Sequence, residues 1–197
     1  REILPLMGSK EGIFHISMAF LNSGDQVLIP NPGYPTYAAV AQLLGVNPIY
    51  YNLDLTNEGR PNLEELETQD LSRVKLMWLN YPHMPTGAPG SEKIWHELIA
   101  FAQRQGIVLV HDNPYSHILN SSPKSLLGLP GGKEVGLELN SLSKTFNIPG
   151  WRVGMLCGKA EWIEATLKVK SNMDSGMFLG LQKGATVALF LGKPWFE

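Results

Sequence analysis

Short apolar runs alternate with longer segments of helical periodicity along this chain, and the alternation limits the folds open to it. Runs typical of buried strands lie at 26–30, 74–79, 108–112 and 153–158. Apolar residues spaced about 3.6 positions apart predict helices over 13–21, 62–67, 91–105, 159–170 and 179–191. Residues 120–133, rich in serine, proline and glycine, predict an exposed loop. This order predicts a layered α/β domain with a mostly parallel sheet.

Composition excludes several classes of protein. Of the 197 residues, 44% are hydrophobic and 17% are charged, and no apolar run is long enough to cross a membrane. A formal charge of -2 lacks the basic excess of nucleic-acid-binding proteins, so neither a membrane nor a nucleic acid is an expected partner. The single cysteine, Cys157, excludes an internal disulfide and fits a reducing cytoplasm. The five histidines have no metal-ligand spacing, and no metal is expected.

The most informative motif follows an apolar strand and reads Ser141-Leu142-Ser143-Lys144, with Arg152 eight positions after the lysine. A lysine on a loop at the end of a strand is suited to form a Schiff base, because partial burial and nearby positive charge lower its pKa. Pyridoxal 5'-phosphate is the obvious carbonyl partner, since hydroxyls and a planar guanidinium suit its phosphate dianion. A polar surface loop is the alternative that this segment alone leaves open.

A second short apolar run ends in a carboxylate, Asp112, with a phenol, Tyr115, three residues further on. The pattern indicates a buried strand with chemistry at its carboxyl end. Asp112 is suited to keep a pyridinium nitrogen protonated, and Tyr115 to donate to the phenolate oxygen of the same ring. The alternatives are a cap or turn carboxylate and a half-buried core phenol.

Two turns add weaker signals. Gly8, Ser9 and Lys10 open a predicted helix, where free backbone N–H groups, a hydroxyl and an ammonium would bind an anion. Simple capping is the alternative there. The turn at 31–35 presents Tyr34, whose ring would either stack on a flat cofactor or pack beneath the loop.

In order and spacing, these motifs resemble the class I/II aminotransferases, which are fold type I pyridoxal-phosphate enzymes. The resemblance covers essentially the whole chain, and its most specific pieces are Ser141-Leu142-Ser143-Lys144 with Arg152, Asp112 with Tyr115, and Pro85-Thr86-Gly87. Segments 8–12, 111–112 and 170–176 are most similar to the alanine and LL-diaminopimelate aminotransferase branch. The resemblance implies a three-layer α/β sandwich with a mostly parallel sheet, and a homodimer.

The resemblance also implies a role for each matching residue. Lys144 would bind the cofactor covalently and then act as the base, while Asp112 holds the ring nitrogen protonated and Tyr115 donates to the ring oxygen. The other expected cofactor-binding residues are Gly8, Ser9, Lys10, Tyr34, Asn80, Ser141, Ser143 and Arg152.

One position departs from the family. The family usually has asparagine immediately before Pro-Thr-Gly, where its amide meets the ring oxygen and the substrate carboxylate, whereas this chain has Met84. A thioether donates no hydrogen bond and accepts only weakly. Either Asn80 or His83 takes over, or substrate anchoring differs, and we assign Met84 no ligand role.

The implied activity is transfer of an amino group between an amino acid and a 2-oxo acid. Residues 1–197 would form the large cofactor domain, truncated at both ends relative to the family. The small domain that helps to anchor the substrate would lie outside them, so the isolated piece is expected to be inactive. A lyase or decarboxylase on the same scaffold, and a pyridoxal-phosphate-sensing domain of a transcriptional regulator, are the alternatives.

Overall fold

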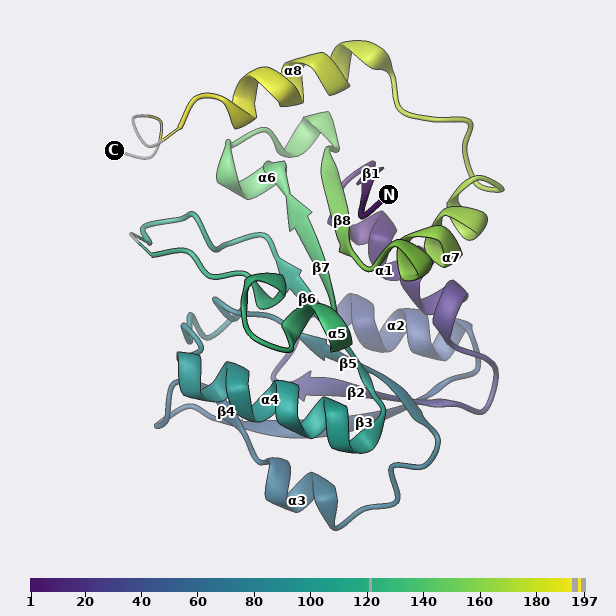
Figure 1. The fold of residues 1–197 in the computed structure, drawn as a ribbon, viewed down its shortest axis with the longest axis vertical. Helices are drawn as coiled ribbons and strands as arrows, with labels where there is room; N and C mark the ends of the chain where they lie inside the picture. Colours follow the sequence, from purple (N-terminus) through teal and green to yellow (C-terminus); the bar gives the residue numbers. More distant parts are fainter. Residues whose placement is uncertain (121, 193–194, 196–197) are drawn as a thin grey trace.

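The computed structural model describes residues 1–120, 122–192 and 195. Eight strands form one sheet (Figure 1), and they are β1 (Ile3–Leu6), β2 (Gln26–Asn31), β3 (Asn47–Asp54), β4 (Arg60–Pro61), β5 (Val74–Leu79), β6 (Val108–Asn113), β7 (Gly136–Ser141) and β8 (Gly154–Gly158). Their order across the sheet is β1-β8-β7-β6-β5-β2-β3-β4. Neighbours from β7 through to β3 are parallel, and only the pairs involving β1, β8 and β4 are antiparallel. The predicted mostly parallel sheet is confirmed.

The helices are α1 (Ser9–Phe20), α2 (Pro35–Leu43), α3 (Leu63–Glu67), α4 (Glu92–Gln105), α5 (Gly132–Val135), α6 (Leu142–Thr145), α7 (Ala160–Lys170) and α8 (Leu179–Leu189), with 3-10 turns η1 (Leu126–Gly128) and η2 (Pro149–Trp151). Each predicted helix is confirmed, and α1 begins at Ser9 with Gly8 as its N-cap, so Gly8, Ser9 and Lys10 open this helix as expected. Helix α2 was not predicted.

The prediction of an exposed loop over 120–133 is wrong in part. The 3-10 turn η1 and the first residues of α5 lie inside it, and Leu126 is fully buried. Leu126 packs in the same hydrophobic core as α4, which folds this segment back onto the sheet. Residue 121 lies outside the described part of the chain.

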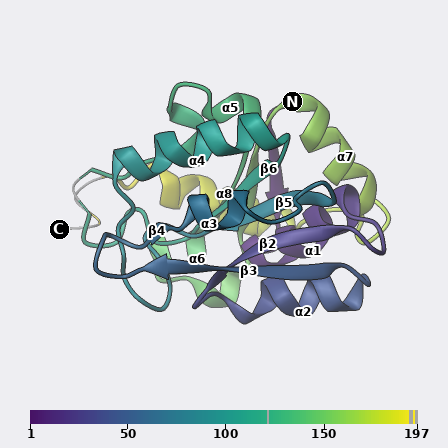
Figure 2. The ribbon, with the colours of Figure 1, turned by 90° about the horizontal axis from the view of Figure 1, so that it is seen from below.

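Strand β5 shows how the sheet divides the core into two layers. Leu76 and Trp78 belong to the hydrophobic cluster on one face, while Met77 and Leu79 belong to the cluster on the other. This is the two-residue alternation of a strand buried on both sides. Figure 2 shows the sheet between α4 and α2, and the clusters place α3 with α4 and place α1 and α7 with α2. The three-layer sandwich is confirmed.

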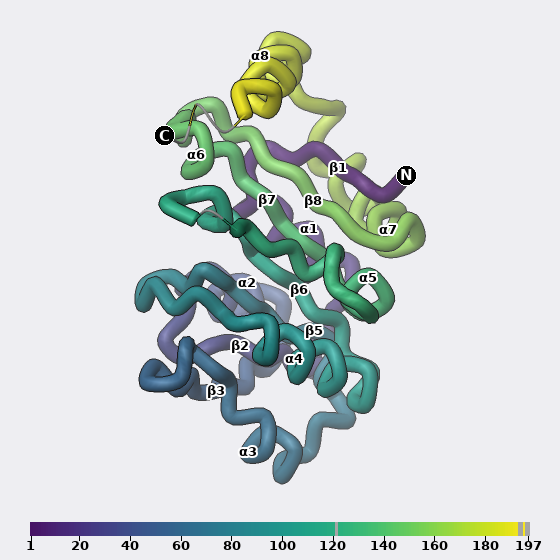
Figure 3. The backbone as a smooth tube through the Cα atoms, turned by 60° about the vertical axis from the view of Figure 1, so that its left-hand side comes forward, coloured from purple at the N-terminus to yellow at the C-terminus, as the bar shows by residue number. Residues whose placement is uncertain are grey.

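Helix α8 lies at the end of the molecule near α6 and β8, remote from β3 and α3 (Figure 3). It packs through a small cluster that joins its Ala185 and Ala188 to Leu142, Phe146 and Val153. Much of its remaining apolar surface is exposed, including Val187 and Leu189, as is Phe190 directly after it. Among the described residues, no helix combines the length and the apolar character needed to cross a membrane.

Gly12 tests the contact between α1 and the sheet. A Cβ added there would lie 2.4 Å from a Leu139 methyl carbon and 2.7 Å from one of Leu6, and both leucines are fully buried. Gly12→Ala should therefore lower the free energy of unfolding by about 1–3 kcal/mol, despite the better helix propensity of alanine.

The matched control is Gly180→Ala, because its added Cβ would meet only the exposed side chain of Phe178. Chemical denaturation should place this variant within about 1 kcal/mol of the parent protein. Equal stability of the two variants would show that α1 has room to move away from the sheet.

Candidate active site

A cavity of about 510 Å³ opens where β5, β6 and β7 end and where α1 and α2 begin. Carboxyl ends of parallel strands are the usual place for ligand sites in open α/β sheets. Its lining consists of Ser9, Lys10, Tyr34, Tyr37, Asn80, Met84, Asp112, Pro114, Tyr115, Ser141, Ser143, Lys144, Pro149 and Arg152. Every site residue expected from the sequence is therefore brought to one cavity, except Gly8, which lies directly behind Arg152.

Asp112 forms the buried floor of this cavity. Its side chain is 5% exposed, and the Tyr37 hydroxyl donates to Oδ2 at 2.9 Å. Oδ1 has no hydrogen-bond partner among the described residues. Burial raises the pKa of Asp112 to about 6, against the hydrogen bond from Tyr37 and the charge of His111, which lower it. The floor thus presents an acceptor that needs one more donor.

Tyr37 is a site residue that the sequence analysis missed. It lies on the first turn of α2, and its ring stacks on Trp78 with centroids 4.9 Å apart and an angle of 6° between the planes. Burial, followed by the charge of Asp112, raises its pKa well above the ordinary value, so the phenol keeps the proton that it donates. The one available signal was its place three residues after Tyr34, one helical turn away.

Two half-buried phenols line the cavity beside this floor, Tyr34 and Tyr115. The ring of Tyr34 packs edge-on against Tyr37 at 5.7 Å, and the Lys10 ammonium lies 5.6 Å from its centroid. Burial, with the nearby charge of Asp112, raises the pKa of Tyr115, which keeps its hydroxyl a donor. Both aromatic residues line the cavity, and Tyr34 also packs against the core cluster that contains Tyr37.

Serine hydroxyls and a guanidinium gather at the other end of the cavity. Arg152 donates from Nη1 to Ser143 Oγ at 3.3 Å and to the Pro149 carbonyl at 3.0 Å. Its backbone has φ 54°, a conformation that non-glycine residues rarely adopt. A Cβ on Gly8 would lie 2.2 Å from Arg152 Nη2, so only glycine lets the guanidinium lie against the first turn of α1.

Lys144 lies in α6, a single helical turn directly after β7, rather than on a loop. Ser141 caps this turn by accepting from the Ser143 N–H at 3.3 Å. The lysine is exposed and lines the cavity. The turn therefore places Lys144 at the edge of the sheet, in the wall of the cavity.

Comparison with known proteins identifies the family. The family model described as aminotransferase class I and II matches residues 1–189. The chain belongs to this family.

Curated and solved relatives agree. The LL-diaminopimelate aminotransferase of Dehalococcoides mccartyi strain BAV1 is 44% identical over 190 residues, which cover 95% of this chain and 49% of that protein. The BacF structure from Bacillus subtilis has a TM-score of 0.92 at 36% identity, over 98% of this chain and 49% of that one. A probable N-succinyldiaminopimelate aminotransferase from Thermus thermophilus also reaches 0.92, at 33% identity over 98% and 52%. This chain spans about half the length of the relatives that it matches.

In this class I/II aminotransferase chain, Asn80 fixes the loop that carries Met84, the residue found where the family usually has asparagine. Its Nδ2 donates to the Asp112 carbonyl at 2.8 Å, and its Oδ1 accepts from the Met84 N–H at 2.7 Å. His83 is buried, with Nδ1 2.8 Å from Thr86 Oγ1, and is not part of the cavity lining. Of the two candidates to replace the family asparagine, only Asn80 reaches the cavity.

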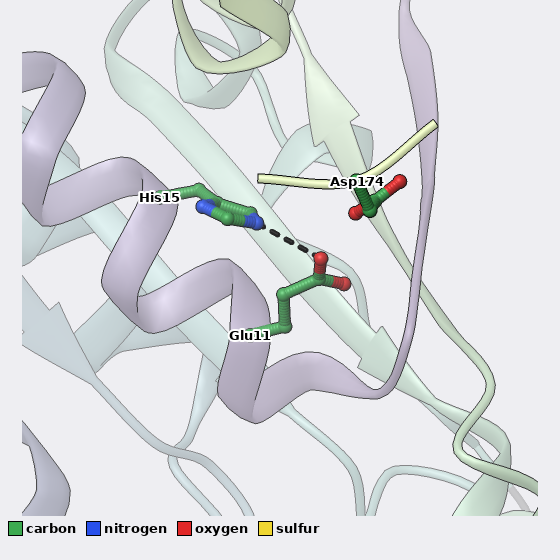
Figure 4. Close-up of side chains that lie close together, drawn as sticks. All are labelled: Glu11, His15 and Asp174. Atoms are coloured by element: carbon green, nitrogen blue, oxygen red, sulfur yellow. Dashed lines mark hydrogen bonds and ion pairs between the residues drawn. The ribbon is translucent and has the colours of Figure 1, made fainter. Parts of the chain in front are cut away.

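Close to the first turn of α1, the side chains of Glu11, His15 and Asp174 bring ligand-type atoms within 4.8 Å of one another (Figure 4). The Lys170 ammonium lies 2.9 Å from Glu11 Oε1 and 2.5 Å from Asp174 Oδ2. Glu11 also accepts from the backbone N–H of Met7. The cluster is an ion-pair network that ties the end of α7 to the turn carrying Ser9 and Lys10.

Asp112→Asn tests the electrostatic cost of the cavity floor. A carboxylate whose folded pKa is about 6, against 3.8 ordinarily, destabilises the fold where it is ionised, above pH 6. The asparagine variant should be more stable than the parent at pH 8, by up to about 3 kcal/mol, and the gain should shrink to nothing as pH falls toward 4.

Thermal or chemical denaturation between pH 4 and pH 8, without added ligand, measures this difference. Asp174→Asn is the contrasting variant, because its ion pair with Lys170 lowers the pKa of Asp174. It should lose stability at pH 8. A gain in stability for Asp112→Asn that does not depend on pH would show that the ionised Asp112 carboxylate does not destabilise the fold.

Proposed function

We propose that this chain is the large cofactor domain of a pyridoxal-phosphate-dependent aminotransferase. The observation that carries the proposal is the unpartnered Oδ1 of buried Asp112 in a cavity that Lys144 also lines. A buried acceptor needs a donor, and a protonated pyridine nitrogen is one.

The residues present fit this cofactor at both of its ends. Arg152, Ser141, Ser143, Ser9 and Lys10 supply the charged and hydroxyl donors that a phosphate dianion needs when it leaves water. Gly8 leaves space that any Cβ would fill, against Arg152. Tyr34 and Tyr115 supply aromatic surface and a hydroxyl donor between the two ends.

Bound pyridoxal phosphate supplies a carbonyl carbon for amines and a cationic ring that accepts electrons when a C–H bond of the amino acid breaks. Lys144 would hold the cofactor and, once released by the incoming amino group, move the α-proton as general base. Asp112 would hold the proton on the ring nitrogen, and Tyr115 would donate to the ring oxygen. Asn80 would keep the Asp112 strand end and the Met84 loop in register through its two hydrogen bonds.

The substrates proposed are an amino acid and a 2-oxo acid. Curated relatives at 41–46% identity are named LL-diaminopimelate aminotransferases, so LL-diaminopimelate is the first amino donor to test. Because the chain spans about half of those relatives, the activity is proposed for the whole protein, and the 197-residue piece should be inactive. Equimolar formation of a new 2-oxo acid and a new amino acid would separate transamination from a lyase or decarboxylase reaction.

We also propose a homodimer that works in the cytoplasm. Exposed Phe178, Val187 and Phe190 around α8 supply apolar surface suited to contact with further protein. The one cysteine, Cys157, is a free thiol, which suits a reducing compartment.

Borohydride reduction after addition of pyridoxal phosphate should fix the cofactor on Lys144, because that amine lines the cavity and follows β7 directly. Peptide mapping by mass spectrometry identifies the labelled lysine. Lys144→Arg should abolish the label and Lys168→Arg, an exposed change on α7, should not. Label on Lys10, the other lysine of the cavity, would contradict the assignment.

Arg152→Ala should weaken binding of pyridoxal phosphate by roughly tenfold or more, because it removes a charged donor from the phosphate end. Equilibrium titration of cofactor absorbance measures the dissociation constant. Arg104→Ala is the control, since Arg104 pairs with Glu67 at the surface and leaves the cavity lining intact. An unchanged constant for Arg152→Ala would show that its guanidinium serves only the Pro149 and Ser143 contacts.

A further inference from the structure

Helix α8 lies closer to the segment that carries Arg152 than a side chain at the contact point would allow. A Cβ added to Gly184, in the middle of α8, would lie 2.6 Å from Cζ3 and 3.1 Å from Cη2 of Trp151. Glycine weakens a helix interior, and close packing is the usual reason for finding it there. Trp151 is the last residue of η2 and directly precedes Arg152.

A small buried cluster joins α8 to the residues around two cations of the cavity wall, Lys144 and Arg152. Its members are Leu142, Phe146, Val153, Ala185 and Ala188. The first two flank Lys144 at a spacing of two positions, and Val153 directly follows Arg152. Among the described residues, α8 contributes none to the cavity lining, so its contacts reach these cations from outside the cavity.

Arg152 depends on its neighbours because its own backbone is unfavourable. Its φ of 54° lies in the left-handed region, which a residue with a side chain keeps only where the surrounding structure constrains it. The contact of Trp151 with α8 on one side and the burial of Val153 on the other supply that constraint. With the backbone fixed in this way, the guanidinium reaches the Pro149 carbonyl at 3.0 Å and Ser143 Oγ at 3.3 Å.

We propose that α8 fixes the position of the Arg152 guanidinium through the contact between Gly184 and Trp151. Trp151 is thus a positioning residue that acts through Arg152 and does not itself line the cavity. The consequence for a bound phosphate rests on the proposed function, whereas the placement of the guanidinium does not.

The effect should be confined to one end of the cavity. Asp112 and Tyr37 are joined by their own hydrogen bond at the floor, and neither belongs to the cluster that includes α8. A displacement of Trp151 should therefore move the charged donor of the phosphate end and leave the floor unchanged.

Gly184→Ala tests the contact, and Gly180→Ala is its matched control. Both substitutions put one methyl group on α8 and replace glycine by a better helix former. The first methyl would meet the Trp151 ring, whereas the second would meet only the exposed side chain of Phe178. Because the alanines of α8 lie in the buried cluster, the exposed Trp151 ring is the part that must yield.

The first experiment uses protein without pyridoxal phosphate and measures how fast phenylglyoxal modifies Arg152, by mass spectrometry of its peptides. Two hydrogen bonds hold this guanidinium, so Gly184→Ala should raise the rate about threefold or more relative to exposed Arg104 in the same sample. Trp151→Ala, which removes the ring and adds no clash, should raise it as well, and Gly180→Ala should not. An unchanged rate ratio in folded Gly184→Ala or folded Trp151→Ala would overturn the proposal.

The second experiment compares pyridoxal 5'-phosphate with pyridoxal, which lacks the phosphate. Gly184→Ala should raise the dissociation constant of the phosphate ester by about three- to tenfold, because a charged donor is displaced, and that of pyridoxal by less than about twofold. Gly180→Ala should change neither. Equal increases for both ligands, or none for the phosphate ester, would overturn the proposal. A parent protein that binds neither ligand would count against the proposed function, and the phenylglyoxal rates would still decide the position of Arg152.

Discussion

The site depends on a buried carboxylate that has a hydrogen-bond partner on only one of its two oxygens. Asp112 is held inside the sheet by its strand neighbours and by Tyr37, while its buried Oδ1 has no partner among the described residues. Burial raises its pKa to about 6, so the fold bears an electrostatic cost that a cationic ligand would relieve. A buried carboxylate with a raised pKa and an unpartnered oxygen is typical of binding sites rather than of stable cores.

The topology brings the other groups to this carboxylate. Parallel β5, β6 and β7 end at the same edge, so Asn80, Asp112 and Ser141 come together from distant parts of the sequence. The single turn of α6 then places Lys144 beside them, and the left-handed backbone of Arg152 turns its guanidinium back toward Ser143 and the start of α1. The proposed sites for ring and phosphate are thus two ends of one sheet edge.

Strand β6 carries polar side chains on both of its faces, and they make different contacts. Asp112 meets Tyr37 on the cavity side, and His111 meets Glu138 on the α4 side. Glu138 also accepts from Asn113, Ser125, Leu126 and Asn140, so a buried hydrogen-bond network holds the α4 side of the strand.

Sequence analysis predicted the elements whose patterns are unambiguous. The central strands and the long amphipathic helices were found because burial on two faces or on one stripe leaves a clear period. Strand β3 was missed because it mixes polar and apolar residues near the sheet edge, and α2 because its proline at the first helical position also fits a turn.

The candidate site was predicted to a similar extent, since its motifs are local while its hydrogen bonds are not. Ser141, Lys144 and Arg152 lie within one short segment, but Tyr37 meets Asp112 across 75 positions and His111 meets Glu138 across 27. These long-range contacts depend on the order of the strands in the sheet and on the helices packed against it, which the sequence alone did not specify. The exposure of Lys144 likewise depends on α6 being a helical turn at the sheet edge.

In the proposed complex, the free Oδ1 of Asp112 accepts a hydrogen bond from the protonated ring nitrogen of pyridoxal phosphate. Nitrogen-15 NMR of bound pyridoxal phosphate, labelled at the ring nitrogen, tests this directly. The measurement is made at pH 8, where a pyridine nitrogen without an ionised carboxylate beside it would carry no proton. We expect a protonated nitrogen with the parent protein and an unprotonated one with Asp112→Asn. An unprotonated ring nitrogen in the parent complex would contradict it.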